Sequence, residues 1–139
     1  MLSQEDLKEI EKAVSLAETK TSGEIRVHID NKCEIDAYER GLKIFQELEM
    51  HKTKLRNGIL IYLDFTNRKL AIIGDKGIHD KVGIEFWEIT KTNLINQFKT
   101  ENFIHGIIQS VKILGEKLEK YFPSTMSNPD ELSNEVTVG

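Results

Sequence analysis

Hydrophobic residues recur every three or four positions in four stretches of the chain, which is the spacing of an amphipathic helix. The predicted helices cover residues 3–20, 37–51, 80–98 and 103–121. Between Glu24 and Asp30 apolar and polar residues alternate strictly, which predicts a half-buried strand. Ile59–Leu63 and Leu70–Ile73 are continuously apolar, as expected for strands that are covered on both faces. The pattern therefore predicts four helices and three strands.

The predicted elements follow one another in the order α-β-α-β-β-α-α. The first strand, the helix after it and the second strand form a βαβ unit, whose strands should be parallel with a right-handed crossover. The polar residues 64–69 return the third strand as an antiparallel hairpin. Because helices precede, separate and follow the strands, we expect an α/β fold, a three-layer α/β/α sandwich around a small mixed β-sheet.

Length and composition indicate one domain and a tail. The 139 residues suffice for a single domain with a hydrophobic core, and we place that domain at residues 1–122. Residues 123–139 are rich in serine, asparagine, threonine and acids, and they hold both prolines. We predict that they form a C-terminal tail that docks at its end, where residues 135–138 suit an edge strand.

Charge and cysteine content exclude several classes of function. The net charge of -4 argues against a nucleic-acid partner, which needs a basic face. No apolar run approaches the roughly 18 residues that a membrane span requires, and the charged N-terminus lacks the apolar segment of a signal peptide. The single cysteine, Cys33, excludes an intrachain disulfide and a zinc site built from several cysteines. We therefore expect a cytoplasmic protein.

The predicted topology brings three polar segments to one end of the sheet. The parallel strands begin at Glu24 and just after Asn57, and the antiparallel third strand finishes beside them at Asp75. Asp80 follows in the next segment. Carboxylate and amide oxygens are the ligands that Ca²⁺ and Mg²⁺ take in proteins. The first hypothesis is therefore a divalent-cation site formed by these four residues.

Two further hypotheses assign a different function to this chain. Arg26 and Lys76 would offset the charge of a phosphate oxygen, which makes a metal-assisted acid phosphatase (a phosphomonoesterase) the second hypothesis. We assign no catalytic residue, because the sequence holds no nucleophile elbow and no P-loop. The third is a module that docks on a protein partner through its tail or a terminal helix. An ordinary turn stays the alternative explanation of Gly74–Gly77.

Successive segments of the chain resemble motifs of the TPM domain family, which includes thylakoid-lumen phosphatase-like and photosystem II repair-like proteins. The motifs match in order and spacing at residues 21–27, 57–62 and 68–77. A later segment with Gly106 inside an apolar helix is similar to the final helices of that family. The resemblance covers about residues 3–122, nearly the whole expected domain.

The resemblance implies an α/β/α sandwich, a divalent-cation site in loops at one end of the sheet, and the acid phosphatase activity reported for a plant relative. Glu24, Asn57 and Asp75 occupy motif positions that match, and Asp80 follows in a loop where family members often carry acids. The sequence shows none of the leader, transmembrane anchor or Gly/Ser-rich tail of many relatives. We therefore expect no membrane-linked role.

Overall fold

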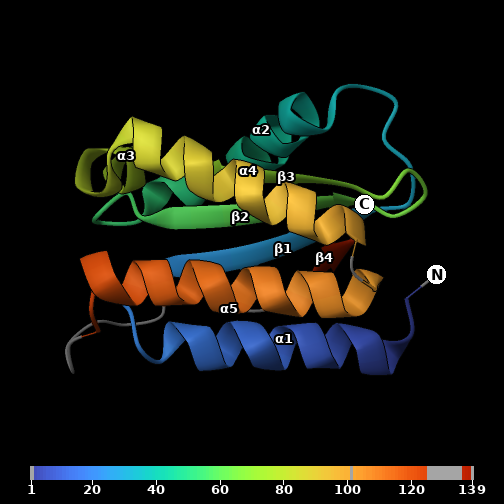
Figure 1. Cartoon of the computed structure of the whole chain (residues 1–139), viewed down its shortest axis with the longest axis horizontal. Coiled ribbons are helices and arrows are strands. Elements are labelled where there is room, and N and C mark those ends of the chain that lie inside the picture. Colours follow the sequence, from blue (N-terminus) through green and yellow to red (C-terminus); the bar gives the residue numbers. More distant parts are fainter. Residues whose placement is uncertain (1, 101, 125–135, 139) are drawn as a thin grey trace.

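The fold is a mixed β-sheet with helices on both of its faces (Figure 1). A computed structural model describes residues 2–100, 102–124 and 136–138 of the chain. The elements in these ranges are α1 (Gln4–Glu18), β1 (Glu24–Asp30), α2 (Ala37–Glu47), the 3₁₀ helix η1 (Met50–Lys52), β2 (Gly58–Asp64), β3 (Lys69–Gly74), α3 (Lys76–Val82), α4 (Ile84–Thr100), α5 (Phe103–Tyr121) and β4 (Thr137–Val138). The predicted α/β sandwich is confirmed.

The sheet has the strand order β3-β2-β1-β4. β1 and β2 are parallel with Glu24 opposite Gly58, and β2 and β3 are antiparallel with Ile59 opposite Gly74. The predicted βαβ unit and hairpin are therefore both present. β4 pairs in parallel with β1, where Thr137 lies opposite His28. The first residue of the expected edge strand, at position 135, lies outside the described residues.

Two hydrophobic clusters lie on opposite faces of the sheet. The larger cluster packs α1, α4 and α5 against residues such as Ile25, Ile61 and Ile72. The smaller cluster lies on the other face, where α2 packs against Leu60 and Tyr62. Neighbouring residues of β2 thus point into different clusters, and all seven residues of this strand are buried. Burial on both faces explains why β2 reads as a continuous apolar run.

The helix starts follow from local chemistry that the sequence displays. Ser3 caps α1 in a capping box with Asp6, and Asp36 caps α2 by accepting a hydrogen bond from the backbone of Glu39. Asn102 caps α5 in the same manner. Such side chains satisfy backbone N–H groups that have no partner within the first turn of a helix.

The predicted helix over residues 80–98 is wrong at its start and in its continuity. The structure has two helices there, because α3 already begins at Lys76 with Asp75 as its N-cap. α3 ends at Gly83, whose φ of 88° suits a residue without a side chain. Gly77, predicted to lie in a turn, therefore lies in the first turn of a helix.

The expectation of a half-buried β1 is also wrong. Its apolar side chains are buried as predicted, but the polar side chains of Glu24, His28 and Asp30 are buried as well. Only Arg26 keeps intermediate exposure. Side chains of other elements, among them Arg40, Tyr62 and Thr137, contact His28 and Asp30 on this face. Among the described residues, no helix has the length and apolar character needed to cross a bilayer.

Candidate functional site

The starts of β1 and β2 and the end of β3 meet at one end of the sheet. The Glu24 backbone N–H donates to the Asn57 carbonyl at 3.3 Å, and that of Asp75 donates to the Gly58 carbonyl at 3.0 Å. The Gly77 N–H donates to the Arg56 carbonyl at 2.8 Å, which joins α3 to the segment before β2. We call this region the amino end of the sheet. It brings together the backbone segments that the topology predicted.

Asp75 is held by a bidentate ion pair with Arg56. The guanidinium Nε lies 2.8 Å from Oδ2 and Nη2 lies 2.9 Å from Oδ1. The carboxylate also accepts from the Lys76 backbone N–H at 2.7 Å. The hydrogen bond and the charge of Asp75 raise the pKa of Arg56 above its usual value. The Asp75 side chain is 5 % exposed and that of Arg56 is 46 % exposed, so the carboxylate is buried while much of the arginine side chain reaches solvent.

Glu24 and Asn57 are both buried at this end, with 2 % and 1 % of their surface exposed. The Asn57 amide nitrogen donates to the Ser22 hydroxyl at 3.4 Å, and its backbone N–H donates to the Thr53 hydroxyl at 3.3 Å. Asn57 Oδ1 is buried and accepts no hydrogen bond from the described residues. A buried acceptor in this state costs about 1–3 kcal/mol, so the oxygen is a candidate to bind a ligand.

The other predicted site residues are less buried than these three. Asp80 and Lys76 are exposed on α3, and Arg26 on β1 is half-buried. Arg26 Nε is buried without a hydrogen-bond partner among the described residues. The same part of the chain holds no group of three or more His, Cys, Asp or Glu side chains already placed to hold a metal ion. Glu24, Asn57 and Asp75 therefore share an end of the sheet, whereas Asp80 lies on the exposed surface of α3, and the described residues form no finished coordination shell.

The ion pair that Arg56 makes was not predicted from the sequence. The residue has a positive φ of 51° and directly precedes Asn57 and β2. Its place in the turn opposite the end of β3 was the available signal, because that placement brings a cation to Asp75.

A second polar cluster, also missed, lies at the opposite end of β1. Asp30 Oδ2 accepts from the Tyr62 hydroxyl at 2.6 Å and from Arg40 Nε at 2.9 Å. Asp30 Oδ1 lies 2.9 Å from His28 Nε2, and His28 Nδ1 lies 2.7 Å from the Thr137 hydroxyl of β4. The strand alternation placed His28 and Asp30 on one face, but only the fold supplies their partners.

The hydrogen bonds of this cluster fix the charge of Asp30. Burial alone would raise its pKa, but hydrogen bonds from Arg40, Tyr62 and His28 outweigh burial and lower the pKa below its usual value. Burial and the hydrogen bond to Asp30 raise the pKa of Tyr62. A cavity of about 400 Å³ beside Asp30 is also lined by Cys33 and Arg40. Because both carboxylate oxygens already accept hydrogen bonds, this cluster stabilises the fold rather than offering a free base.

Comparison with known proteins gives a family and solved structures with the same fold. The model of the TPM domain family matches residues 1–117. The NMR structure of the BA42 protein from the psychrophilic bacterium Bizionia argentinensis is 42 % identical, with a TM-score of 0.89, over 100 % of this chain and 96 % of that chain. The N-terminal domain of a P. gingivalis protein shares the fold at 16 % identity, with a TM-score of 0.67, over 87 % of this chain and 78 % of that chain. No curated protein matches the chain.

Proposed function

This chain belongs to the TPM domain family, and on that premise we propose that the amino end of the sheet binds a divalent cation, Ca²⁺ or Mg²⁺. The observation that carries the proposal is the buried Asn57 Oδ1, which accepts no hydrogen bond from the described residues. The adjoining strand ends supply the carboxylates of Glu24 and Asp75. An amide oxygen with two carboxylates is a donor set that hard cations prefer.

Arg56 competes with a divalent cation for Asp75, because its guanidinium already pairs with that carboxylate. A cation that uses Asp75 has to displace this exposed side chain. We therefore expect weak binding, in the range of about 0.1–1 mM that extracellular calcium modules show. Removing the competing charge with Arg56→Gln should raise the affinity about tenfold, since about 1.4 kcal/mol corresponds to a factor of ten.

The test is a titration of the full chain with Ca²⁺ and, separately, Mg²⁺, followed by amide NMR shifts and by the melting temperature. Binding to the folded state alone should raise the melting temperature as the cation concentration rises. The amide shifts should centre on Glu24, Asn57 and Asp75, and Asp75→Asn should abolish them. Glu34→Gln, an exposed change at the other end of β1, is the matched control.

Asp80→Asn decides whether Asp80 belongs to the site, because loss of affinity would show that the exposed carboxylate reaches the cation. The proposal fails if about 10 mM of either cation, well above the expected range, leaves both the natural chain and the folded Arg56→Gln variant unshifted.

We confine the proposal to binding. The imidazole of His79 contacts the Gly74 carbonyl at 3.2 Å and meets the Trp87 ring edge-on. Neither partner is a nucleophile that the imidazole could activate, so we assign His79 no catalytic role. Phosphatase activity, with Arg26 and Lys76 at a phosphate, stays a prediction for assay with Asp75→Asn as the control.

A further inference from the structure

A cavity of about 250 Å³ lies at the carboxyl end of β1, away from the amino end of the sheet. The described residues that enclose it come from the start of α1, the end of β1, the β2–β3 hairpin and β4. Figure 1 shows the start of α1, the hairpin and β4 toward the same end of the molecule. The cavity shares no lining residue with the proposed cation site, so it is a separate candidate for a ligand site.

The walls of this cavity are hydrophobic. Ile29 of β1 lies deepest, with 4 % of its surface exposed. Leu2, Leu7 and Phe65 line the cavity as well, and all three are half-buried. These four residues belong to the larger hydrophobic cluster or pack against it. Val138 of β4 is 59 % exposed, so it lies at the mouth, and the cavity is an opening of the larger cluster toward solvent.

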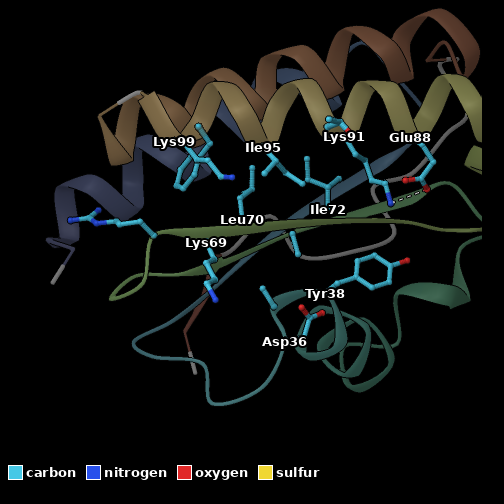
Figure 2. Close-up of a pocket in the computed structure, with 14 residues that line it drawn as sticks. Asp36, Tyr38, Lys69, Leu70, Ile72, Glu88, Lys91, Ile95 and Lys99 are labelled. Atoms are coloured by element: carbon cyan, nitrogen blue, oxygen red, sulfur yellow. Dashed lines mark ion pairs between the residues drawn. The ribbon is translucent and has the colours of Figure 1, made fainter.

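None of the described residues that line this cavity carries a charge. Other cavities of the molecule differ in this respect. The cavity of about 380 Å³ beside β3 (Figure 2) is lined by charged side chains of both signs, among them Glu88, Lys91 and Lys99. An ionised ligand would lose its hydration between apolar walls without gaining an opposite charge. The lining therefore selects a neutral and mainly apolar ligand.

The polar side chains in the described lining are the amides of Gln4 and Asn31. Both residues are exposed, so their amides lie at the rim of the cavity. Each amide offers a hydrogen-bond donor and an acceptor. A neutral ligand can therefore place an apolar body between the walls and one hydrogen-bonding group at the rim, as is typical of small-molecule sites.

Hydrogen bonds and ring contacts hold the walls in place. The Phe65 backbone N–H donates to the Asp30 carbonyl at 2.9 Å, and the Thr66 N–H donates to the Asn31 carbonyl at 2.9 Å. These bonds fix the hairpin against the end of β1. The Phe65 ring meets the Phe103 ring edge-on, with 5.0 Å between the ring centroids. A cavity formed in advance binds its ligand without the cost of ordering its walls.

We propose that this cavity binds a small neutral aromatic compound with one hydrogen-bonding group, of the chemical class of the indoles and phenols. An apolar cavity of about 150 Å³ holds a benzene molecule, so a cavity of about 250 Å³ has room for a bicyclic ring. A ring can pack against Phe65 edge-on or in an offset stack. A rigid ring also loses no internal freedom on binding, unlike an alkyl chain.

The test titrates the full chain with indole and follows its amide and methyl NMR signals. The signals of Leu7, Ile29 and Phe65 should shift with a dissociation constant of about 1 mM, as expected for so small a ligand. The signals of Glu24, Asn57 and Asp75 should not shift. Octanol should bind more weakly than indole, because its chain loses internal freedom in the cavity.

Two charged analogues of indole test the selection for a neutral ligand. Indole-3-carboxylate is an anion and tryptamine is a cation at neutral pH. Each should bind at least about tenfold more weakly than indole, because its charge would have to leave water without an opposite charge in the cavity. Using both signs separates an uncharged cavity from a site with a hidden cation or anion.

Val138→Trp should weaken indole binding at least about fivefold, because the new ring lies at the mouth and competes for the cavity. Leu16→Trp is the matched control. It adds the same ring on α1 at a position that is 62 % exposed and outside the described lining, and should leave indole binding unchanged. Both substitutions are at exposed positions and neither touches the amino end of the sheet, so the result is independent of cation binding.

Four results would each overturn the proposal. Unmoved Leu7, Ile29 and Phe65 signals at about tenfold above the expected dissociation constant would show that the cavity takes no ring. Unchanged affinity in the folded Val138→Trp variant would place indole elsewhere. Equal binding of either charged analogue would remove the selection for a neutral ligand. Tighter binding of octanol than of indole would make the occupant an alkyl chain.

Discussion

At the carboxyl end of β1, the two oxygens of Asp30 contact side chains from three elements. They are His28 of β1 itself, Arg40 of α2 and Tyr62 of β2. The Asp30 side chain is 8 % exposed, so its charge depends on these partners rather than on water. Removing one member of a buried pair leaves the opposite charge uncompensated, which costs more than the pair itself contributes.

Asp30→Asn should lower the free energy of unfolding at neutral pH by about 3 kcal/mol, because Arg40 and Tyr62 lose their anionic acceptor. The effect also depends on pH. The pKa of Asp30 is lowered in the folded state, so its stabilisation is complete above the usual aspartate value of about 4 and is lost as the pH falls through the lower folded value.

Urea unfolding of the natural chain and Asp30→Asn at pH 7 and pH 3 measures this. The difference in stability between the two should be large at pH 7 and smaller at pH 3. Glu34→Gln, an exposed neighbour, should change neither value. A difference that is the same at both pH values would show that the charge of Asp30 contributes nothing.

At the scale of elements, α3 is fixed to the segment before β2 through Gly77. A Cβ added at Gly77 would lie 2.1 Å from the Leu55 carbonyl oxygen and 2.6 Å from that of Arg56. Both contacts are with backbone, which cannot rotate away as a side chain can. The hydrogen bond from the Gly77 N–H to the Arg56 carbonyl is the reason for this close approach.

Gly77→Ala should therefore destabilise the chain by about 2 kcal/mol, as overpacking does, although alanine is the better helix former. Chemical denaturation measures the loss, and amide NMR should show shifts at Arg56 and Asp75. Lys76→Ala, an exposed change one residue earlier in the same helix, is the control. A stabilised Gly77→Ala variant would mean that helix propensity outweighs the backbone contact.

The elements that the sequence predicts well are those with a periodic pattern and a local cap. The alternation in β1 and the apolar run in β2 give their bounds almost completely, and α5 matches its predicted range of residues 103–121. Topology then predicted that Glu24, Asn57 and Asp75 share one end of the sheet. That step needs strand directions only, which hydrophobic pattern and hairpin length supply.

Side-chain partners were not predictable in the same way. The Arg56–Asp75 and Asp30–Tyr62 contacts join residues 19 and 32 positions apart, so no local pattern indicates them. The start of α3 was missed because Asp75 and Gly77 are also typical of turns, and only the contact with Arg56 selects the helix. Tertiary contacts thus decide the details of the site.

For the whole molecule, β2 makes the two hydrophobic clusters one structural unit. Leu60 and Tyr62 belong to the cluster beneath α2, whereas Ile59, Ile61 and Leu63 belong to the cluster beneath α1, α4 and α5. If β2 separates from one cluster, its side chains in the other cluster become exposed as well. A fold built in this way should unfold in one cooperative step.

Ile44→Ala tests that cooperativity from one face to the other. Ile44 of α2 is 3 % exposed in the smaller cluster, so truncation should cost about 3 kcal/mol. Trp87, the single tryptophan, is 1 % exposed in the larger cluster and reports there by fluorescence. In the Ile44→Ala variant, the urea transitions followed by Trp87 fluorescence and by far-UV circular dichroism should shift together. The control is Leu42→Ala, at a position 41 % exposed on the same helix, which should shift neither transition by much. If the dichroism transition moved and the Trp87 transition did not, the two faces would unfold separately and β2 would not couple them.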